Sequence, residues 1–426
     1  MILTAIAIIF VLGYLAIALE HPIKVNKSAS ALILGGLLWI IWFKSAGFET
    51  ATPQLFETFG GLAQILFFLL GAMTIVAIVE ANEGFTVITS RIKTHNLRIL
   101  IWIISWLTFF FSAVLDNLTT TIVMMTLVRK LIFDKNTRLY VAGIIIIAAN
   151  AGGAFSPIGD VTTTMLWIGG QISAEGIIKV LFAPSVMALL VPLIVLTFFI
   201  KGELQPQAHQ EASSEQGPSA FEKKLLFFAG VCGLLMVPAI KIIFHVPPYV
   251  AMLFVLGWLW LVVELLARKH HENAPKRLNL FHVLKEVDVA SVLFFAGILL
   301  AVGTLEATGQ LHHLAELLNE YIGNTSAIVL AIGILSAIVD NVPLVAATQG
   351  MYLIADYPMD RFLWEFIAYC AGTGGSMLVI GSAAGVAAMG IDKNLSFGWY
   401  LKRICPLAFL GYGAGALTYL IIAGAL

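Results

Sequence analysis

Charged residues are scarce in this chain. Of its 426 residues, 24 are Lys or Arg and 25 are Asp or Glu, so 12% are charged, against about 25% in soluble domains. Hydrophobic residues make up 60%. This balance excludes an ordinary soluble domain and predicts an all-α protein that crosses a lipid bilayer many times. The net charge of −1 gives no indication of a nucleic-acid partner, and we expect none.

Cysteines are few as well. Cys232, Cys370 and Cys405 are odd in number, scattered, and placed in apolar segments. We therefore expect small core residues, with neither a disulfide framework nor a cysteine metal site, and no cofactor. The first apolar run also lacks a basic stretch ahead of it, which argues against a cleaved signal peptide. Nothing in the composition predicts an enzyme.

Long apolar runs follow the same order in each half of the chain. Three spans come first, then a long segment with Asp-Asn in its middle, then a segment rich in Gly and Ser, then a final span. The runs are 2–19, 28–43, 62–80, 97–133, 138–172 and 177–200, followed by 222–243, 248–267, 289–306, 324–355, 362–391 and 401–425. The polar stretch 201–221 predicts a cytoplasmic linker between a first repeat, 1–200, and a second, 222–426.

One motif occurs twice, 224 residues apart. Ser112-Ala-Val-Leu-Asp116-Asn117 returns as Ser336-Ala-Ile-Val-Asp340-Asn341, and both copies lie inside long apolar segments. Each segment is too long for one helix and too short for two spans with a loop. We predict two re-entrant hairpins, 97–133 and 324–355, with Asp-Asn at the tip, because non-helical backbone at membrane depth is tolerated only inside protein or beside a wet cavity.

The placement of basic residues supports this topology. With both hairpins and an outside N-terminus, 20 of the 24 Lys and Arg residues fall on the inner side, as the positive-inside rule requires. Each half then has five full spans, an odd number, so the second half is inverted relative to the first and the C-terminus is also outside. Inverted repeats are typical of secondary transporters.

The Gly-rich segments predict two broken helices, 138–172 and 362–391. Pro157 and neighbouring glycines interrupt the first, and Gly374-Gly375-Ser376 marks the second. Freed carbonyls and side-chain oxygens at such breaks bind hard cations. Close packing remains an alternative for the glycines, and back-bonding to helix carbonyls for the threonines. The candidate ligands are Asn150, Ser156, Asp160, Thr162 and Thr163 in the first half and Thr373, Ser376 and Ser382 in the second.

Three carboxylates lie in these membrane segments: Asp116, Asp160 and Asp340. No Lys or Arg lies within ten residues of any of them in these spans, and an unpaired carboxylate in a membrane indicates function. Asn117 and Asn341 are expected to orient ligands or to cap the tips. Because Asp160 aligns with Ser382, we expect a strong Na⁺ site at Asp116 and Asp160 and a weaker, pseudo-symmetric one at Asp340.

The motifs carry a resemblance to a known family. The twin Ser-Ala-x-x-Asp-Asn tips, Asn-Ala-Gly-Gly-Ala-x-Ser-Pro-x-Gly-Asp-x-Thr-Thr and Gly-Thr-Gly-Gly-Ser resemble the NhaD-type sodium/proton antiporters of the ion-transporter superfamily. The resemblance covers essentially the whole chain. It implies a scaffold region, a transport region of two hairpins and two broken helices, elevator-like movement and a homodimer. By the family pattern, activity resides in Asp116, Asn117, Asn150, Asp160 and Thr162, and in Ser336, Asp340, Asn341 and Ser376.

The resulting hypothesis is exchange of Na⁺ or Li⁺ for H⁺ across a bacterial-type inner membrane. Cation and proton would compete for the dehydrated carboxyl groups of Asp116 and Asp160. A sodium-coupled dicarboxylate symporter is one alternative, but related symporters carry Ser-Asn-Thr at the tips, and an anion prefers cationic groups at its site. A metalloid extruder of the same superfamily is another. An intramembrane aspartyl protease leaves the twin hairpins unexplained.

Overall fold

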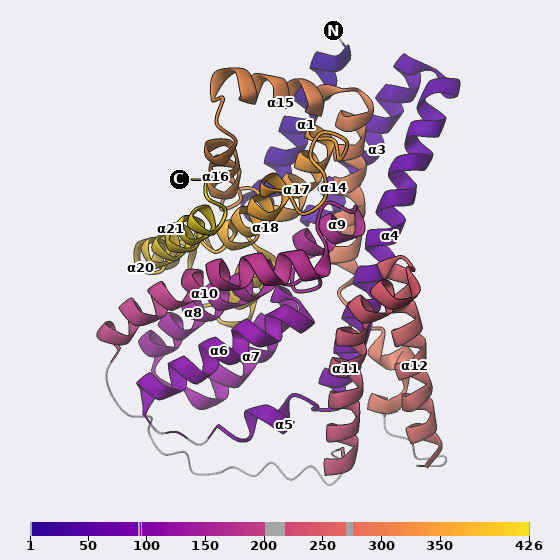
Figure 1. The fold of residues 1–426 in the computed structure, drawn as a ribbon. Coiled ribbons are helices and arrows are strands. Elements are labelled where there is room, and N and C mark those ends of the chain that lie inside the picture. Colours follow the sequence, from indigo (N-terminus) through magenta and orange to yellow (C-terminus); the bar gives the residue numbers. More distant parts are fainter. Residues whose placement is uncertain (1, 93, 95, 201–217, 270–275, 426) are drawn as a thin grey trace.

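The computed structural model describes residues 2–92, 94, 96–200, 218–269 and 276–425, and every regular element in this part of the chain is a helix (Figure 1). Most of the expected linker, 201–221, lies outside these residues. The first half contains α1 (Ile2–Ala18), α2 (Glu20–Ile23), α3 (Lys27–Ala46), α4 (Phe48–Ala81), α5 (Thr86–Thr89), α6 (Leu97–Leu115), α7 (Asn117–Leu131), α8 (Lys135–Ala154), α9 (Val161–Ile168) and α10 (Ala174–Phe199).

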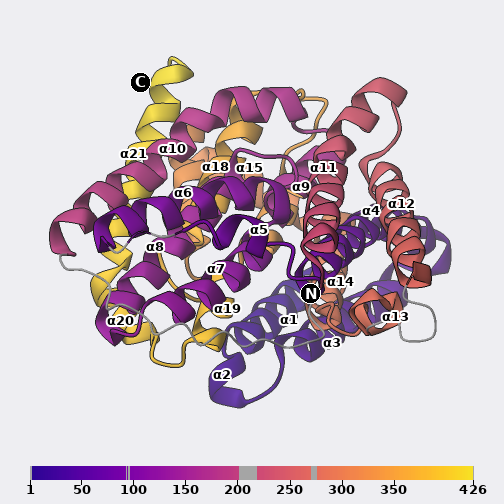
Figure 2. The same ribbon diagram turned by 90° about the horizontal axis from the view of Figure 1, so that it is seen from below.

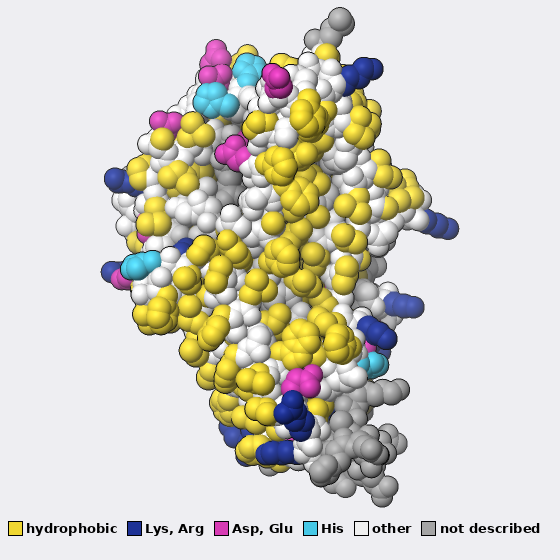
Figure 3. All heavy atoms as spheres, turned by 90° about the vertical axis from the view of Figure 1, so that its right-hand side faces the viewer, with side chains coloured by type: hydrophobic (Ala, Val, Ile, Leu, Met, Phe, Trp, Pro, Cys, Tyr) yellow, Lys and Arg dark blue, Asp and Glu magenta, His cyan; other side chains and the backbone are white. Residues whose placement is uncertain are grey.

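The second half repeats much of this order. Its helices are α11 (Ala220–Phe244), α12 (Pro248–Lys269), η2 (Lys276–Leu278), α13 (Leu280–Val283), α14 (Val289–Ala307), α15 (Gln310–Tyr321), α16 (Thr325–Leu335), α17 (Asn341–Met351), α18 (Phe362–Gly374), α19 (Ala383–Ile391), α20 (Phe397–Arg403) and α21 (Cys405–Ile422). Within the described residues, nine helices are long and apolar enough to cross a membrane, or ten if the bent pair α15–α16 is one span. A broad band of hydrophobic side chains covers the face shown in Figure 3. The chain is a multi-pass membrane protein.

Each segment with Asp-Asn in its middle is interrupted at that dipeptide. α6 and α7 are separated by Asp116 alone, whose φ of 84° turns the chain, and the two helices pack against each other. In the second half, residues 336–340 separate α16 from α17. Asp116 and Asp340 are the N-caps of α7 and α17, each accepting a main-chain N–H of the following helix. An Asp side chain that satisfies a free helix N–H stabilises the new helix start.

Both Gly-rich segments form broken helices. α8 and α9 are joined by unwound residues 155–160, and α18 and α19 by residues 375–382. Pro157 supplies no N–H for a continuing helix, and Asp160 and Ser382 cap the helices that follow. The N-terminal parts, α8 and α18, are almost fully buried and pack against each other at the centre of the molecule.

The two halves interlock. Seen from below, α1, α3, α4, α12 and α14 lie on one side, while α6, α8, α10 and α21 lie on the other (Figure 2). α3 packs on α14, and α4 on α12, so each pair joins both halves. The Ser28 hydroxyl donates to Ala290 O (2.7 Å) and Trp39 Nε1 to Leu300 O (2.9 Å), which shows that α3 and α14 run parallel.

Two elements differ from the expected spans. α4 begins at Phe48 rather than near residue 62, because residues 48–61 include two glutamates and lower the hydropathy without breaking the helix. α15 was not expected. It is amphipathic and lies at 120° to α16, so it leads into the second hairpin at a sharp angle.

Candidate cation-binding site

Asp116 binds the start of its own hairpin's second helix. Its Oδ1 accepts the Thr119 N–H at 2.8 Å and its Oδ2 accepts the Thr119 hydroxyl at 3.0 Å. The positive end of the α7 dipole therefore faces the carboxyl group. These bonds leave part of the acceptor capacity of the two oxygens unused.

Asp160 is more deeply enclosed, with only 2% of its surface exposed. Its Oδ1 accepts the Thr162 N–H at 3.4 Å, and its Oδ2 accepts Nδ2 of Asn341 at 3.1 Å. Asn341 is the first residue of α17, after the second Asp-Asn break, so the acid of one half is held by the amide of the other. The buried hydroxyl of Thr162 makes no hydrogen bond within the described part of the chain, and it is available as a ligand.

A chain of amides joins the first tip to both broken helices. Asn117 Nδ2 donates to Asn150 Oδ1 at 3.1 Å, and Asn150 Nδ2 donates to the Ser382 hydroxyl at 3.0 Å. Asn150 also donates to Ile146 O within α8. The structure thus brings together Asn117, Asn150 and Ser382 as one buried network.

The other predicted hydroxyls bond to main-chain carbonyls. Ser156 donates to Ala113 O and Ser336 to Ala371 O, and each bond joins a broken helix to the segment that carries Asp-Asn in the same half. Thr163, Thr373 and Ser376 donate to carbonyls three or four residues earlier, respectively Asp160 O, Tyr369 O and Thr373 O. In this conformation these hydroxyls support the backbone, as the back-bonding alternative anticipates for Thr163. Their role as cation ligands stays a prediction.

No described basic side chain balances Asp116 or Asp160. Neither forms an ion pair with a described residue. Asp160 lies within electrostatic range of Asp340 and of Asp116. Among the described residues no three His, Cys, Asp or Glu side chains cluster as a metal centre. The donors present are carboxylate, amide and hydroxyl oxygens, which suit a hard cation such as Na⁺.

Comparison with known proteins identifies the family. Residues 5–364 match the family described as "Citrate transporter". "Sodium/proton antiporter 1" of Arabidopsis thaliana is 46% identical over 98% of this chain and 72% of its own length. "Na(+)/H(+) antiporter NhaD" of Vibrio cholerae is 32% identical over 98% of this chain and 91% of its own. The chain belongs to the NhaD family. The YdaH transporter of Alcanivorax borkumensis shares the fold, with a TM-score of 0.56 and 12% identity over 93% of this chain and 97% of YdaH.

Asp340 requires a correction. The sequence left it without a basic partner, but in this NhaD-family chain Lys27 Nζ lies 3.6 Å from Asp340 Oδ2. Lys27 is the first residue of α3, far from the second hairpin in sequence, so a search within the same span could not find it. The carboxyl group also accepts the Val342 N–H at 3.3 Å. The three membrane acids therefore have three different kinds of partner.

Sequence reasoning also missed Thr119 and Thr120. Thr119 holds Asp116 through its N–H and its hydroxyl, and the buried Thr120 hydroxyl makes no hydrogen bond among the described residues. The sequence does contain a pattern that could have indicated these threonines. A run of three threonines follows each first-half acid, 119–121 after Asp116 and 162–164 after Asp160, whereas Asp340 is followed by Asn341-Val342-Pro343.

Proposed function

We propose that this protein exchanges Na⁺, or Li⁺, for H⁺, with both ions competing for the carboxyl groups of Asp116 and Asp160. The observation that carries the proposal is the enclosure of Asp160. Its carboxyl group is buried, it is held by neutral donors alone, and no ion pair to a described residue balances it. An unbalanced carboxylate inside a membrane protein must bind a proton or a cation.

The movements of Na⁺ and H⁺ are coupled if the carboxyl groups of Asp116 and Asp160 hold either the cation or protons, but never both at once. When Asp116 and Asp160 are ionised, their oxygens and the Thr162 hydroxyl supply ligands for one dehydrated cation. When they are protonated, they lose the charge that holds the cation. Asn341 and Thr119 donate hydrogen bonds to the carboxylate form, so they favour cation binding over protonation. An inward proton gradient would then drive Na⁺ out.

Citrate or dicarboxylate symport is the second candidate, favoured by the description of the matched family. A polyanionic substrate needs cationic groups or free helix N-termini. Here the acids cap the N-termini of α7, α9 and α17, and Lys27, which lies beside the second tip, is paired with Asp340. The charges therefore favour a cation as cargo.

Proteoliposomes test both candidates directly. We expect Na⁺ and Li⁺ to dissipate an imposed proton gradient reported by a pH-sensitive dye, and K⁺, citrate and succinate not to. Asp116→Asn and Asp160→Asn should each lower the rate by at least about 100-fold, since a neutral amide cannot release a proton for a cation. Asp356→Asn, at an exposed loop acid, is the matched control. Full activity of either site variant would overturn the competition mechanism.

The finer architecture belongs to the same proposal. We infer that 1–200 and 222–426 are inverted repeats, supported by contacts that recur in both halves: Ser112 donates to Ala149 O as Ser336 donates to Ala371 O. The helices α6–α10 and α16–α21 would form a transport body that moves elevator-like against the other helices. A homodimer, outside termini, the cytoplasmic linker and a bacterial-type inner membrane are also proposed, on the family resemblance and the positive-inside rule.

A further inference from the structure

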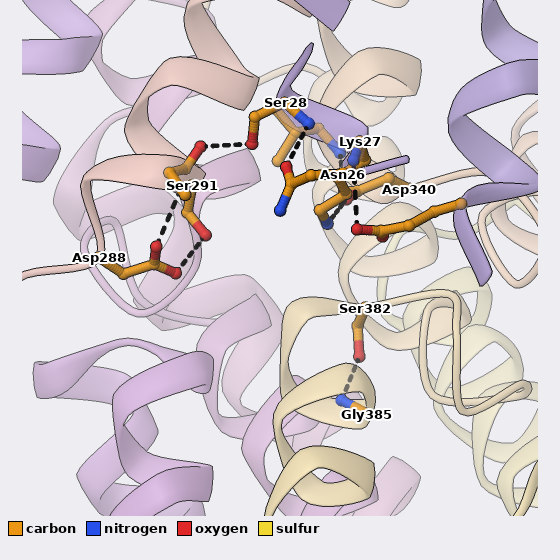
Figure 4. Close-up of polar contacts among 11 residues, drawn as sticks. Asn26, Lys27, Ser28, Asp288, Ser291, Asp340, Ser382 and Gly385 are labelled. Carbon is orange, nitrogen blue, oxygen red and sulfur yellow. Dashed lines mark hydrogen bonds and ion pairs between the residues drawn. The ribbon is translucent and has the colours of Figure 1, made fainter. Parts of the chain in front are cut away.

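Lys27 and Asp340 connect the start of α3 to the start of α17. Lys27 Nζ lies 3.6 Å from Asp340 Oδ2 (Figure 4). It also lies 4.4 Å from the centre of the Phe294 ring. The side chains are 23% and 17% exposed, so water screens the pair only in part. Phe294 belongs to α14, which packs along α3, whereas Asp340 caps α17 at the tip of the second hairpin.

The position of Lys27 in its helix is unfavourable on local grounds. It is the first residue of α3, and a cation at a helix N-terminus is repelled by the helix dipole. The capping of α3 is done by Asn26, whose side chain accepts the Ser28 N–H, so Lys27 contributes nothing to the cap. A partly buried ammonium group at this end requires a carboxylate opposite it, and Asp340 is that carboxylate.

A small cavity of about 60 Å³ lies beside the pair, with Tyr14, Glu20, Lys27 and Asp340 in its lining. This volume accommodates water or a partly hydrated ion. Glu20 Oε1 accepts the main-chain N–H of Lys27 at 3.2 Å, so a second carboxylate lies at the start of α3 and in the lining of the same cavity.

We propose that Lys27 is a tethered cation that occupies the Asp340 carboxylate in this conformation. Asp340 can take up Na⁺ or H⁺ only after the Lys27 ammonium group has left, so exchange takes place at Asp116 and Asp160 while Lys27 holds α17 against α3. The inference rests on the proposed Na⁺/H⁺ exchange. Lys27 acts through Asp340 and is therefore a positioning residue rather than an ion ligand.

Substitution of Lys27 and Asp340 should have effects unlike those of substituting ordinary ion ligands. Removing Asp340 alone leaves an ammonium group unbalanced beside the tip, whereas removing both charges leaves a neutral contact. Removing Lys27 alone leaves a carboxylate that must bind another cation. The neutral double variant should therefore exchange Na⁺ for H⁺ faster than the single Asp340 variant. The Lys27 variant should bind more Na⁺ than the unmodified protein.

The experiment uses full-length protein with Lys27→Met, Asp340→Asn, the double variant and the conservative Lys27→Arg. Lys24→Met, at an exposed lysine three residues away, is the control. In proteoliposomes we expect Asp340→Asn to lower Na⁺-driven proton movement at least about tenfold, and the double variant to return within about threefold of the unmodified rate. Lys27→Arg and Lys24→Met should stay near that rate. Equilibrium binding of radioactive Na⁺ to purified protein should show one additional ion per chain in Lys27→Met.

Two results would overturn the proposal. A double variant as slow as Asp340→Asn would make Asp340 an obligatory ion ligand, and unchanged Na⁺ binding in Lys27→Met would show that the lysine blocks no site. If Lys27→Met does not give monodisperse protein, Lys27→Gln replaces it. A double-mutant cycle on thermal unfolding in detergent tests the pair without transport. Suppose that the cycle shows coupling between Lys27 and Asp340 while the unmodified protein shows no Na⁺-driven proton movement. That combination would refute the proposed function but not the interaction between the two side chains.

Discussion

The three membrane acids show how much of the site follows from residue types. The repeated Asp-Asn motif and the Gly-rich segments indicate Asp116, Asp160 and Asp340 without a structure, because carboxylates are too costly in hydrocarbon to be there by chance. Their partners do not follow. The Asn341–Asp160 hydrogen bond spans 181 residues, and the Lys27–Asp340 pair joins a hairpin tip to the start of α3. Contacts of this range are set by packing between helices.

Asn341 should tune the competition at Asp160. Its Nδ2 donates to Asp160 Oδ2 at 3.1 Å, and a hydrogen bond to a charged group contributes about 1.5–3 kcal/mol. Asn341→Ala removes a donor that favours the ionised form. We expect the Na⁺ concentration for half-maximal exchange, measured at one pH in proteoliposomes, to rise at least about tenfold. Asn319→Ala, at an exposed position of α15, is the control, and an unchanged Na⁺ dependence would contradict this role.

At the scale of the element, breaks are easier to predict than ends. Pro157 and the clustered glycines indicate where α8 gives way to α9, because these residues remove helix donors or side-chain contacts. The start of α4 at Phe48 was missed, since polar residues lower hydropathy but do not end a helix. α15 was missed for two reasons. Its 12 residues are too few to span a bilayer, and they form one apolar and one polar face, so the segment is not a continuous apolar run.

Gly152 sets the distance between a broken helix and a hairpin. A Cβ atom there would lie 2.1 Å from Phe109 O in α6, and one at Gly374 would lie 2.0 Å from Gly333 O in α16. Close packing is therefore the reason for these two glycines. We expect Gly152→Ala to destabilise the protein by at least about 2 kcal/mol in thermal unfolding, because the helices must separate. Gly36→Ala, where a Cβ meets nothing within 4 Å, should be neutral; equal effects would contradict the argument.

At the scale of the whole molecule, an ion pair fastens one half to the other. Arg138 Nε lies 2.6 Å from Asp392 Oδ2 and joins α8 to the loop after α19. Burial alone would raise the pKa of Asp392, but the Arg138 guanidinium and the N–H groups of Asn394 bring that pKa below its ordinary value. A depressed pKa means that the pair stabilises the protein above the unfolded pKa of about 3.9, and that this stabilisation is lost as the pH falls through the folded pKa.

Asp392→Asn should therefore lower the free energy of unfolding by about 2 kcal/mol at pH 7, and the difference from the unmodified protein should shrink as the pH is lowered below about 4. Thermal unfolding in detergent over this pH range measures both effects. Asp356→Asn serves again as the exposed control. A difference that persists undiminished at the lowest pH would show that the ion pair is not its cause.

The fold class and the order of spans follow from hydropathy, charge placement and the internal repeat. How the halves meet does not, because apolar helices in lipid carry little information about which neighbour they choose. Small residues at close contacts and single hydrogen bonds, such as Trp39 to Leu300 O, settle that choice in three dimensions.

The parallel pairing of α3 with α14 has a consequence for biosynthesis. Ser28 and the carbonyl of Ala290, which it binds, are 262 residues apart, so a ribosome needs roughly 10–50 s to deliver the second after the first. During that interval α3 is already in the bilayer without its main neighbour. The nascent first half must therefore wait in the membrane, shielded by lipid or by the insertion machinery, until the second half arrives.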